Sequence, residues 1–292
     1  MSKSLRTALI GLFFAIGVCL LAYPWVSNWL EEQNRAAVMD GYEEVIAAAP
    51  QQDLDAEMEA AQAYEEHLRN GLTRVVDPFD PNAVQASDEE YEACLNLAGD
   101  GVMGEISIPV INATLPIYHG TSDECLQKGV GHLQGTSLPI GGESTHCVLA
   151  GHTGLPTTRI FDSLDQVKEG DIFTITVLGE TLAYKVCDIQ VVLPDESDSL
   201  SVQEGRDLVT LVTCTPYGKN THRLLVTGER CELPDDNDSS AVRDNGWQPS
   251  MQDISLIAAL VTLVVGAVFG GASLVRRRKR KVAFAKHRKR WQ

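Results

Sequence analysis

The chain has 292 residues, and its formal net charge of −16 is distributed very unevenly. All 40 acidic residues but only 12 of the 24 basic residues lie between residues 31 and 253, so this middle region carries a charge of −28. The two ends hold the other 12 basic residues and no acid. Nucleic acid is not an expected partner, because the long acidic region has no excess of basic residues and membrane topology explains the basic tail.

Two apolar segments separate these zones of charge. Residues 8–23 are nearly all apolar, and residues 254–275 contain no charge over a length that can cross the hydrocarbon core as a helix. Basic residues flank the cytoplasmic ends of membrane helices. We therefore expect a cell-membrane protein, with the lipid bilayer as a partner, both termini in the cytoplasm and the acidic region outside the cell. The first segment also fits a cleaved signal peptide, so its fate stays open.

An extracellular location permits disulfide bonds, and the chain has seven cysteines. One of them, Cys19, lies in the first apolar segment, and Cys214 is a candidate nucleophile. The other five are Cys94, Cys125, Cys147, Cys187 and Cys231. Because five is an odd number, at least one is free or pairs elsewhere, and the pairing stays open. The chain contains no CxxC motif, which argues against a thioredoxin-like or zinc-ribbon protein.

Helical patterns fill the region before residue 99. Apolar residues recur at helical spacing between residues 31 and 70, and Pro50 divides them into two helices. Two prolines then stiffen a loop over residues 75–82, and a short acidic helix is expected over residues 87–97. These helices precede the main domain.

From residue 99 to residue 233 the pattern changes to short β-rich runs between turn residues. Seven or eight short strands in about 130 residues predict a mainly-β closed barrel or a sandwich. The expected strands cover residues 103–108, 115–118, 145–150, 172–177, 182–193, 208–214 and 224–231. A single helical turn is expected within residues 163–169. The domain boundaries that follow from these patterns are 1–30, 31–98, 99–233, a linker at 234–252, a membrane helix at 253–275 and a basic tail at 276–292.

Three residues with complementary chemistry lie near the ends of predicted strands. Cys214 ends one run, Arg223 opens the next, and His152 ends an earlier one. A cysteine with a histidine elsewhere in the chain is a candidate nucleophile and base, and an arginine supplies a fixed cation for a developing oxyanion. No metal site is expected, since His132 and His146 lack the ligand spacing of common sites.

The residues around this trio resemble those of the sortase family, and in particular the class C, pilus-assembling sortases of Gram-positive bacteria. The stretch 210–218 (TLVTCTPYG) surrounds the cysteine, 221–226 (THRLLV) the arginine and 149–156 (LAGHTGLP) the histidine. Residues 131–139 (GHLQGTSLP) and 142–146 (GESTH) resemble further class C stretches. The resemblance implies a sortase-like closed barrel with short helices, flanked here by two membrane helices.

The same resemblance assigns roles to further residues. Asp77, Pro78 and Phe79 match the class C lid, in which the acid pairs with the active-site arginine and the aromatic ring covers the thiol. Candidates for substrate binding are Thr213, Thr153 and Leu155. Thr153 stands where these enzymes often carry a basic residue.

The resemblance also implies a reaction that needs no cofactor. Cys214 is expected to cleave an LPxTG-like sorting signal between Thr and Gly and to hold the product as a thioester, which a lysine amine of a pilin subunit then attacks. The alternative is a housekeeping sortase that attaches surface proteins to peptidoglycan. A non-catalytic pilus scaffold does not explain the intact trio, and a papain-like protease needs its cysteine on a helix.

Overall fold

The structure is a computed structural model that describes residues 3–70, 76–80, 88–155, 158–196, 198–234 and 256–263. The chain divides into two units. One unit comprises Met1–Trp29 together with Trp247–Gln292, and the other comprises Leu30–Gly246.

Helix α1 (Lys3–Ala48) passes from the first unit into the second without a break, so the expected boundary at residue 30 lies within one helix. Within the described part of the chain, one helical segment, Gly11–Ala48, contains a window apolar enough to cross a membrane. The second expected membrane helix, residues 253–275, lies largely outside the described residues; residues 256–263 are helical. The prediction of a second span stays a prediction.

The described elements of the second unit are helices α2 and α4, a short α3, three 3-10 turns and eight strands. Their bounds are α2 Gln51–Asn70, α3 Glu89–Ala93, β1 Val102–Ile108, η1 Pro109–Ile111, β2 Ala113–His119, α4 Asp123–Lys128, β3 Val130–His132, β4 Thr145–Ala150, η2 Leu164–Gln166, β5 Ile172–Val177, β6 Glu180–Val192, η3 Asp198–Leu200, β7 Asp207–Thr215 and β8 His222–Cys231.

The eight strands form a closed barrel in the order β1-β2-β3-β4-β7-β8-β6-β5. Two neighbouring pairs, β2 with β3 and β4 with β7, are parallel, and the other pairs are antiparallel. Strand β5 alternates half-buried and buried residues, as a strand with one core face should. Every residue of β4 is buried, which is typical of a strand covered on both faces. The barrel confirms one of the two expected β architectures.

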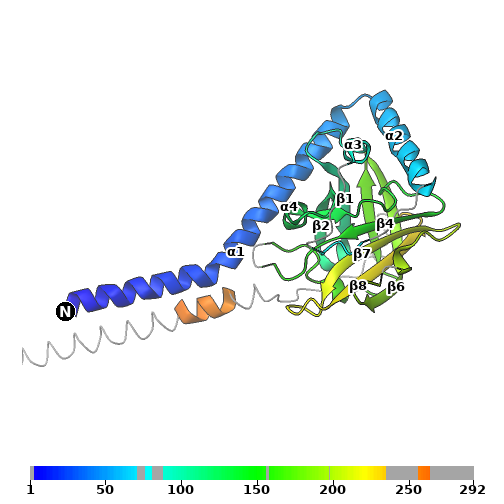
Figure 1. Cartoon of the computed structure of the whole chain (residues 1–292). Helices are drawn as coiled ribbons and strands as arrows, with labels where there is room; N and C mark the ends of the chain where they lie inside the picture. Colours follow the sequence, from blue (N-terminus) through cyan, green and yellow to red (C-terminus); the bar gives the residue numbers. More distant parts are fainter. Residues whose placement is uncertain are drawn as a thin grey trace, which may run out of the picture. The chain divides into compact units, whose positions relative to one another are not determined.

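Within the second unit, the part of α1 from Leu30 onward and helix α2 pack against the barrel as a hairpin that turns near Pro50 (Figure 1). Helix α2 directs Ala61 and Tyr64 into the main core, and Leu54 and Met58 pack at its edge. This confirms the apolar stripe expected from the helical spacing. The acidic helix expected over residues 87–97 is shorter than predicted, because α3 ends at Ala93.

The strand missed by the sequence pattern is β3, which has only three residues. It pairs with β2 on one side and with β4 on the other, so it closes the barrel despite its length. Its residues are all buried, and a three-residue run of Val130, Gly131 and His132 carries no alternation that would reveal a strand.

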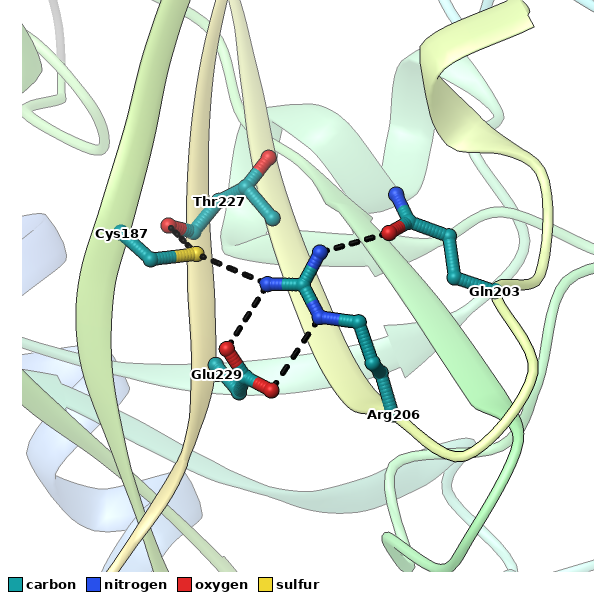
Figure 2. Close-up of polar contacts among 5 residues, drawn as sticks. All are labelled: Cys187, Gln203, Arg206, Thr227 and Glu229. Carbon is teal, nitrogen blue, oxygen red and sulfur yellow. Dashed lines mark hydrogen bonds and ion pairs between the residues drawn. The ribbon is translucent and has the colours of Figure 1, made fainter.

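A cluster of polar and charged side chains lies at the start of β7, the end of that strand away from Cys214 (Figure 2). Arg206 forms a two-pronged ion pair with Glu229 of β8, at 2.7 and 3.1 Å, and also donates to the side chain of Gln203. A third contact joins Arg206 to the sulfur of Cys187 at 3.7 Å. The cluster is partly exposed, so its contribution to stability is expected to be modest, on the order of 1 kcal/mol.

Disulfide bonds are absent from the described residues, which include all seven cysteines. The free thiols are Cys19, Cys94, Cys125, Cys147, Cys187, Cys214 and Cys231. Cys94 and Cys147 are buried inside the barrel domain, where they pack as small apolar side chains.

Candidate active site

Cys214 and Arg223 face each other across the hairpin formed by β7 and β8. Their Cα atoms are direct partners in the antiparallel register. Direct partners project from the same face of the sheet, with side chains close together. Both residues are 8% exposed, so the thiol and the guanidinium share a largely desolvated environment. Cys214 lies near the end of β7 and Arg223 near the start of β8, as the sequence predicts.

His152 reaches the same end of the barrel because β4 runs parallel to β7. The last paired residues are Ala150 and Val212, and the chain continues in the same direction on both strands. Two hydrogen bonds extend this alignment beyond β4: the Gly151 amide donates to the Val212 carbonyl at 3.0 Å, and the Thr213 hydroxyl donates to the Gly151 carbonyl at 2.7 Å. His152 therefore leaves the sheet beside the last residues of β7.

Asp77 pairs with Arg223 from a segment almost 150 residues earlier in the chain. Its two carboxylate oxygens accept from Nε and Nη2 of Arg223 at 2.8 and 2.6 Å, which is the geometry of a bidentate pair. The two side chains are only 11% and 10% exposed. The third guanidinium nitrogen, Nη1, donates to the backbone carbonyls of Asn220 and His222 at 3.3 and 3.1 Å. All three nitrogens are thus engaged.

Phe79 contacts both the histidine and the arginine. Its ring centroid is 5.5 Å from the ring centroid of His152 and 5.2 Å from the guanidinium carbon of Arg223. The ring also packs at the edge of a small buried apolar cluster that includes Val212 of β7. Pro78, between the acid and the aromatic, is buried. The segment 77–79 therefore contacts two members of the trio directly.

The environment of the site favours uncharged forms of the thiol and the imidazole. Burial raises the pKa of the Cys214 thiol; the charge of Arg223 opposes this shift, and the charge of Asp77 adds to it. Burial also lowers the pKa of His152, with a smaller opposing influence from Asp123. Both shifts act against a thiolate–imidazolium pair.

The three substrate-binding candidates occupy different environments. Thr213 is buried, and its hydroxyl is engaged by the Gly151 carbonyl, so it is placed to hold the loop that carries His152. Thr153 is half-buried directly after the histidine, and Leu155 is half-buried at the edge of the main core. Their part in substrate binding stays a prediction.

Two histidines outside the trio have structural partners. His132 is fully buried and contacts the Tyr91 hydroxyl at 2.9 Å and the Ser137 carbonyl at 2.8 Å. His146 contacts the Thr210 hydroxyl at 2.7 Å. These contacts give both histidines hydrogen-bonding roles within the barrel domain. The described part of the chain holds no group of three or more side chains arranged to bind a metal ion.

Two acids near His152 were not identified from the sequence. Asp162 accepts hydrogen bonds from the backbone amides of Gly154 and Ile160, at 3.1 and 3.2 Å, and so joins the two sides of the histidine loop. Asp123, at the start of α4, acts on His152 through its charge. Nothing in the local pattern around either acid separates it from the many surface acids of this chain.

The sortase domain family matches residues 106–231, a span that contains His152, Cys214 and Arg223. The crystal structure of sortase C-1 from Actinomyces oris is 50% identical, covers 62% of this chain and 99% of its own, and has a TM-score of 0.58. The structure described as sortase C1 of GBS Pilus Island 1 is 39% identical over 70% of this chain and 96% of its own, with a TM-score of 0.62.

A curated relative is more distant. Sortase D of Bacillus subtilis (strain 168) is 29% identical over 130 residues, which is 44% of this chain and 63% of that protein. The chain thus spans a little under two thirds of this relative, whereas it spans almost all of the two solved class C structures.

Proposed function

We propose that this chain, which belongs to the sortase family of cysteine transpeptidases, joins pilin subunits to one another. The observation that carries the proposal is the bidentate pair of Asp77 with Arg223, together with the contacts of Phe79 with Arg223 and His152. It is the contact expected of a class C lid. The similarity to solved class C sortases at 39–50% identity supports the same choice.

In the first half of the proposed reaction, the Cys214 sulfur attacks the threonine carbonyl carbon of an LPxTG-like sorting signal as the thiolate. The carbonyl oxygen takes on negative charge, and the Arg223 guanidinium stabilises it. The bond between threonine and glycine breaks, His152 gives a proton to the departing glycine amine, and the pilin remains on Cys214 as a thioester.

In the second half, the amine of a pilin lysine attacks the thioester carbonyl. His152 takes a proton from this amine, the carbon–sulfur bond breaks, and Cys214 leaves as the thiolate. The product is an isopeptide bond. Two successive acyl transfers conserve the free energy of the cleaved peptide bond in the thioester, so the reaction needs neither a nucleotide nor a cofactor.

Arg223 has one N–H left for this role, on Nη2, while Asp77 accepts from Nε and Nη2, because both hydrogens of Nη1 already donate to backbone carbonyls. The Asp77 carboxylate carries the same charge as the oxyanion, and its oxygens take the place where that oxyanion would accept hydrogen bonds. Catalysis therefore requires segment 77–79 to move. We infer that this segment is a lid that closes the site in the absence of substrate.

The second candidate is attachment of surface proteins to peptidoglycan, which uses the same trio with a cell-wall amine as acceptor. The contacts of Asp77 and Phe79 favour the first candidate. For localisation, the apolar segment within α1 supports a membrane anchor, with the barrel outside the cell and both termini in the cytoplasm.

The test is to express the full chain with a pilin that bears an LPxTG-like signal and to examine the products for high-molecular-weight ladders. We expect ladders with the wild type and with Cys187→Ala, a matched loss of an exposed thiol outside the site, and none with Cys214→Ala. Mass spectrometry should find an isopeptide bond between threonine and lysine. Ladders from Cys214→Ala would contradict the role of Cys214 as nucleophile. Linkage of the pilin only to cell-wall fragments would favour attachment to peptidoglycan instead.

A further inference from the structure

The loop that carries His152 is tightly constrained on its barrel side. The Phe161 amide donates to the His152 carbonyl at 3.0 Å. A side chain at Gly151 would approach the Phe161 ring to 2.6 Å, so the backbone there lies directly against the aromatic ring. Asp162 accepts from the amides of Gly154 and Ile160 and so ties the first part of the loop, residues 151–155, to its descending part, residues 158–162. The position of the imidazole therefore depends on this descending part.

This descending part is held from outside the barrel by helix α1. Arg35 of α1 donates a hydrogen bond from Nη1 to the hydroxyl of Thr158. Arg35 is 8% exposed and Thr158 is 1% exposed, so the contact is excluded from water. Burial lowers the pKa of Arg35, and the charges of Glu32 and Glu31 on the same helix oppose this shift more than the charge of Asp162 does. The contact of Arg35 with the loop is therefore its hydrogen bond to Thr158.

Arg35 is not needed to attach α1 to the barrel. Tyr42, two turns further along the helix, donates from its hydroxyl to the Met103 carbonyl at 3.3 Å and accepts from the Leu178 amide at 3.0 Å. Met39 and Tyr42 also pack in a separate apolar cluster with residues of β1 and β2. Burial of a guanidinium is unfavourable compared with burial of an apolar side chain of similar size. What Arg35 adds is the directed hydrogen bond to Thr158.

We propose that Arg35 is a positioning residue for His152, through which helix α1 sets the place of the acid–base group relative to Cys214. The inference rests on the proposed transpeptidase function, and it names a determinant outside the trio and the lid. Proton transfer requires hydrogen-bond contact between the imidazole and the reacting amine, and misplacement by about 1 Å can reduce the rate about 100-fold. An unsupported loop should therefore slow the chemical steps with little effect on binding of the sorting signal.

The experiment compares Arg35→Met and Arg35→Lys in the full chain, with Tyr42→Phe as the matched control that weakens another contact of α1. Initial rates of cleavage of an LPxTG-containing peptide give kcat and KM, and NMR of ¹³C-labelled histidine reports on the His152 imidazole. We expect Arg35→Met to lower kcat about 10- to 100-fold with KM within about threefold. Arg35→Lys, which can still donate to Thr158, should recover part of the loss, and Tyr42→Phe should change kcat less than about threefold.

The His152 signal should shift or broaden in Arg35→Met and keep its wild-type position in Tyr42→Phe. Should Arg35→Met fail to fold, Thr158→Val replaces it, since it removes the acceptor hydroxyl and keeps the buried volume. A variant with wild-type kcat and an unmoved His152 signal overturns the inference. If the wild type itself does not cleave the peptide, the proposed function fails, and the histidine signal alone then decides whether Arg35 positions the loop.

Discussion

Replacement of Asp77 by Asn tests whether segment 77–79 is a lid. The substitution keeps the size of the side chain and removes its charge, and one of its two terminal atoms then presents hydrogens to the guanidinium instead of a lone pair. Loss of one partner from a buried ion pair is unfavourable by about 3–5 kcal/mol, because the other charge stays buried without compensation. In Asp77→Asn this uncompensated charge is that of Arg223, whose side chain is only 10% exposed.

The simplest relief for Arg223 is for the segment to move away and admit water. If about 2 kcal/mol of that penalty favours opening, the ratio of open to closed forms rises about 30-fold, since 1.4 kcal/mol corresponds to a factor of ten. Loss of the Asp77 charge also lowers the pKa of Cys214, because that charge raises it in the wild type. Both effects increase the rate at which a thiol reagent labels Cys214.

The assay separates the two effects by their dependence on pH. Labelling of Cys214 by a neutral aromatic disulfide is followed from about pH 6 to pH 10, with Cys214→Ala as the background from the other six thiols. A greater open population raises the plateau rate at high pH, whereas a lower thiol pKa moves the midpoint to lower pH. We expect a plateau increase of about 10- to 100-fold for Asp77→Asn, and less for Asp188→Asn, a half-buried acid on β6.

The reasoning is refuted if Asp77→Asn labels with the wild-type plateau. A midpoint shift alone would show that Asp77 tunes the thiol electrostatically without controlling access to it. Phe79→Ala gives an independent comparison, because it removes the contacts to His152 and Arg223 and leaves the ion pair in place. A plateau increase in both variants is expected of a lid.

Three further outcomes are expected. Arg223→Lys replaces a planar fork with a point charge, so it should reduce kcat about 100- to 1,000-fold while the chain stays folded, as measured by peptide cleavage and circular dichroism. Burial lowers the pKa of His132 to about 4, below the 6.5 of an exposed imidazole, so the unfolded state binds a proton first as the pH falls. The contribution of this group to the free energy of unfolding is therefore present above pH 6.5, and about 3 kcal/mol of it is lost as the pH falls to 4. Urea titrations at several pH values measure this loss, and His132→Gln should reduce the dependence of the free energy of unfolding on pH. Gly154 has a φ of +80°, and a side chain there would approach the Tyr217 ring to 3.0 Å. Gly154→Ala should therefore lower the free energy of unfolding by at least about 1 kcal/mol. Adding Tyr217→Ala to this variant should recover part of the loss.

The strands could be predicted from the sequence because most of them carry local signals. β5 was predicted with its observed bounds, and β7 and β8 were predicted to within two residues, since β-rich runs end at turn residues. The local patterns left barrel and sandwich open, because the choice depends on the pairing of β1 with β5 across about 70 residues, and only the family resemblance predicted the barrel. Strand β3 escaped prediction for a related reason: its three residues form a strand only between two partners.

The sequence identified the residues of the catalytic trio, but it did not predict the long-range contacts that hold them. Residue types and their neighbours identified Cys214, His152 and Arg223, whereas the contact of Asp77 with Arg223 joins segments 146 residues apart and came only through resemblance. Arg35 lies 123 residues from Thr158 and sits in a helix whose pattern indicates only packing. Such long-range polar contacts leave no periodic signal in the sequence.

The proposed mechanism depends on a single register, because Cys214 and Arg223 must be direct partners to share one face of the hairpin. A slip of one residue would turn the guanidinium to the opposite face and bring His222 or Leu224 opposite the thiol, depending on its direction. The turn prevents this slip. The amides of Lys219 and Asn220 both donate to the Pro216 carbonyl, at 3.0 and 3.1 Å, and Asn220 adopts a left-handed conformation with a φ of 54°. A turn with these bonds closes the hairpin at one loop length, so the residues between the nucleophile and the arginine act on the chemistry by placing both groups on one face.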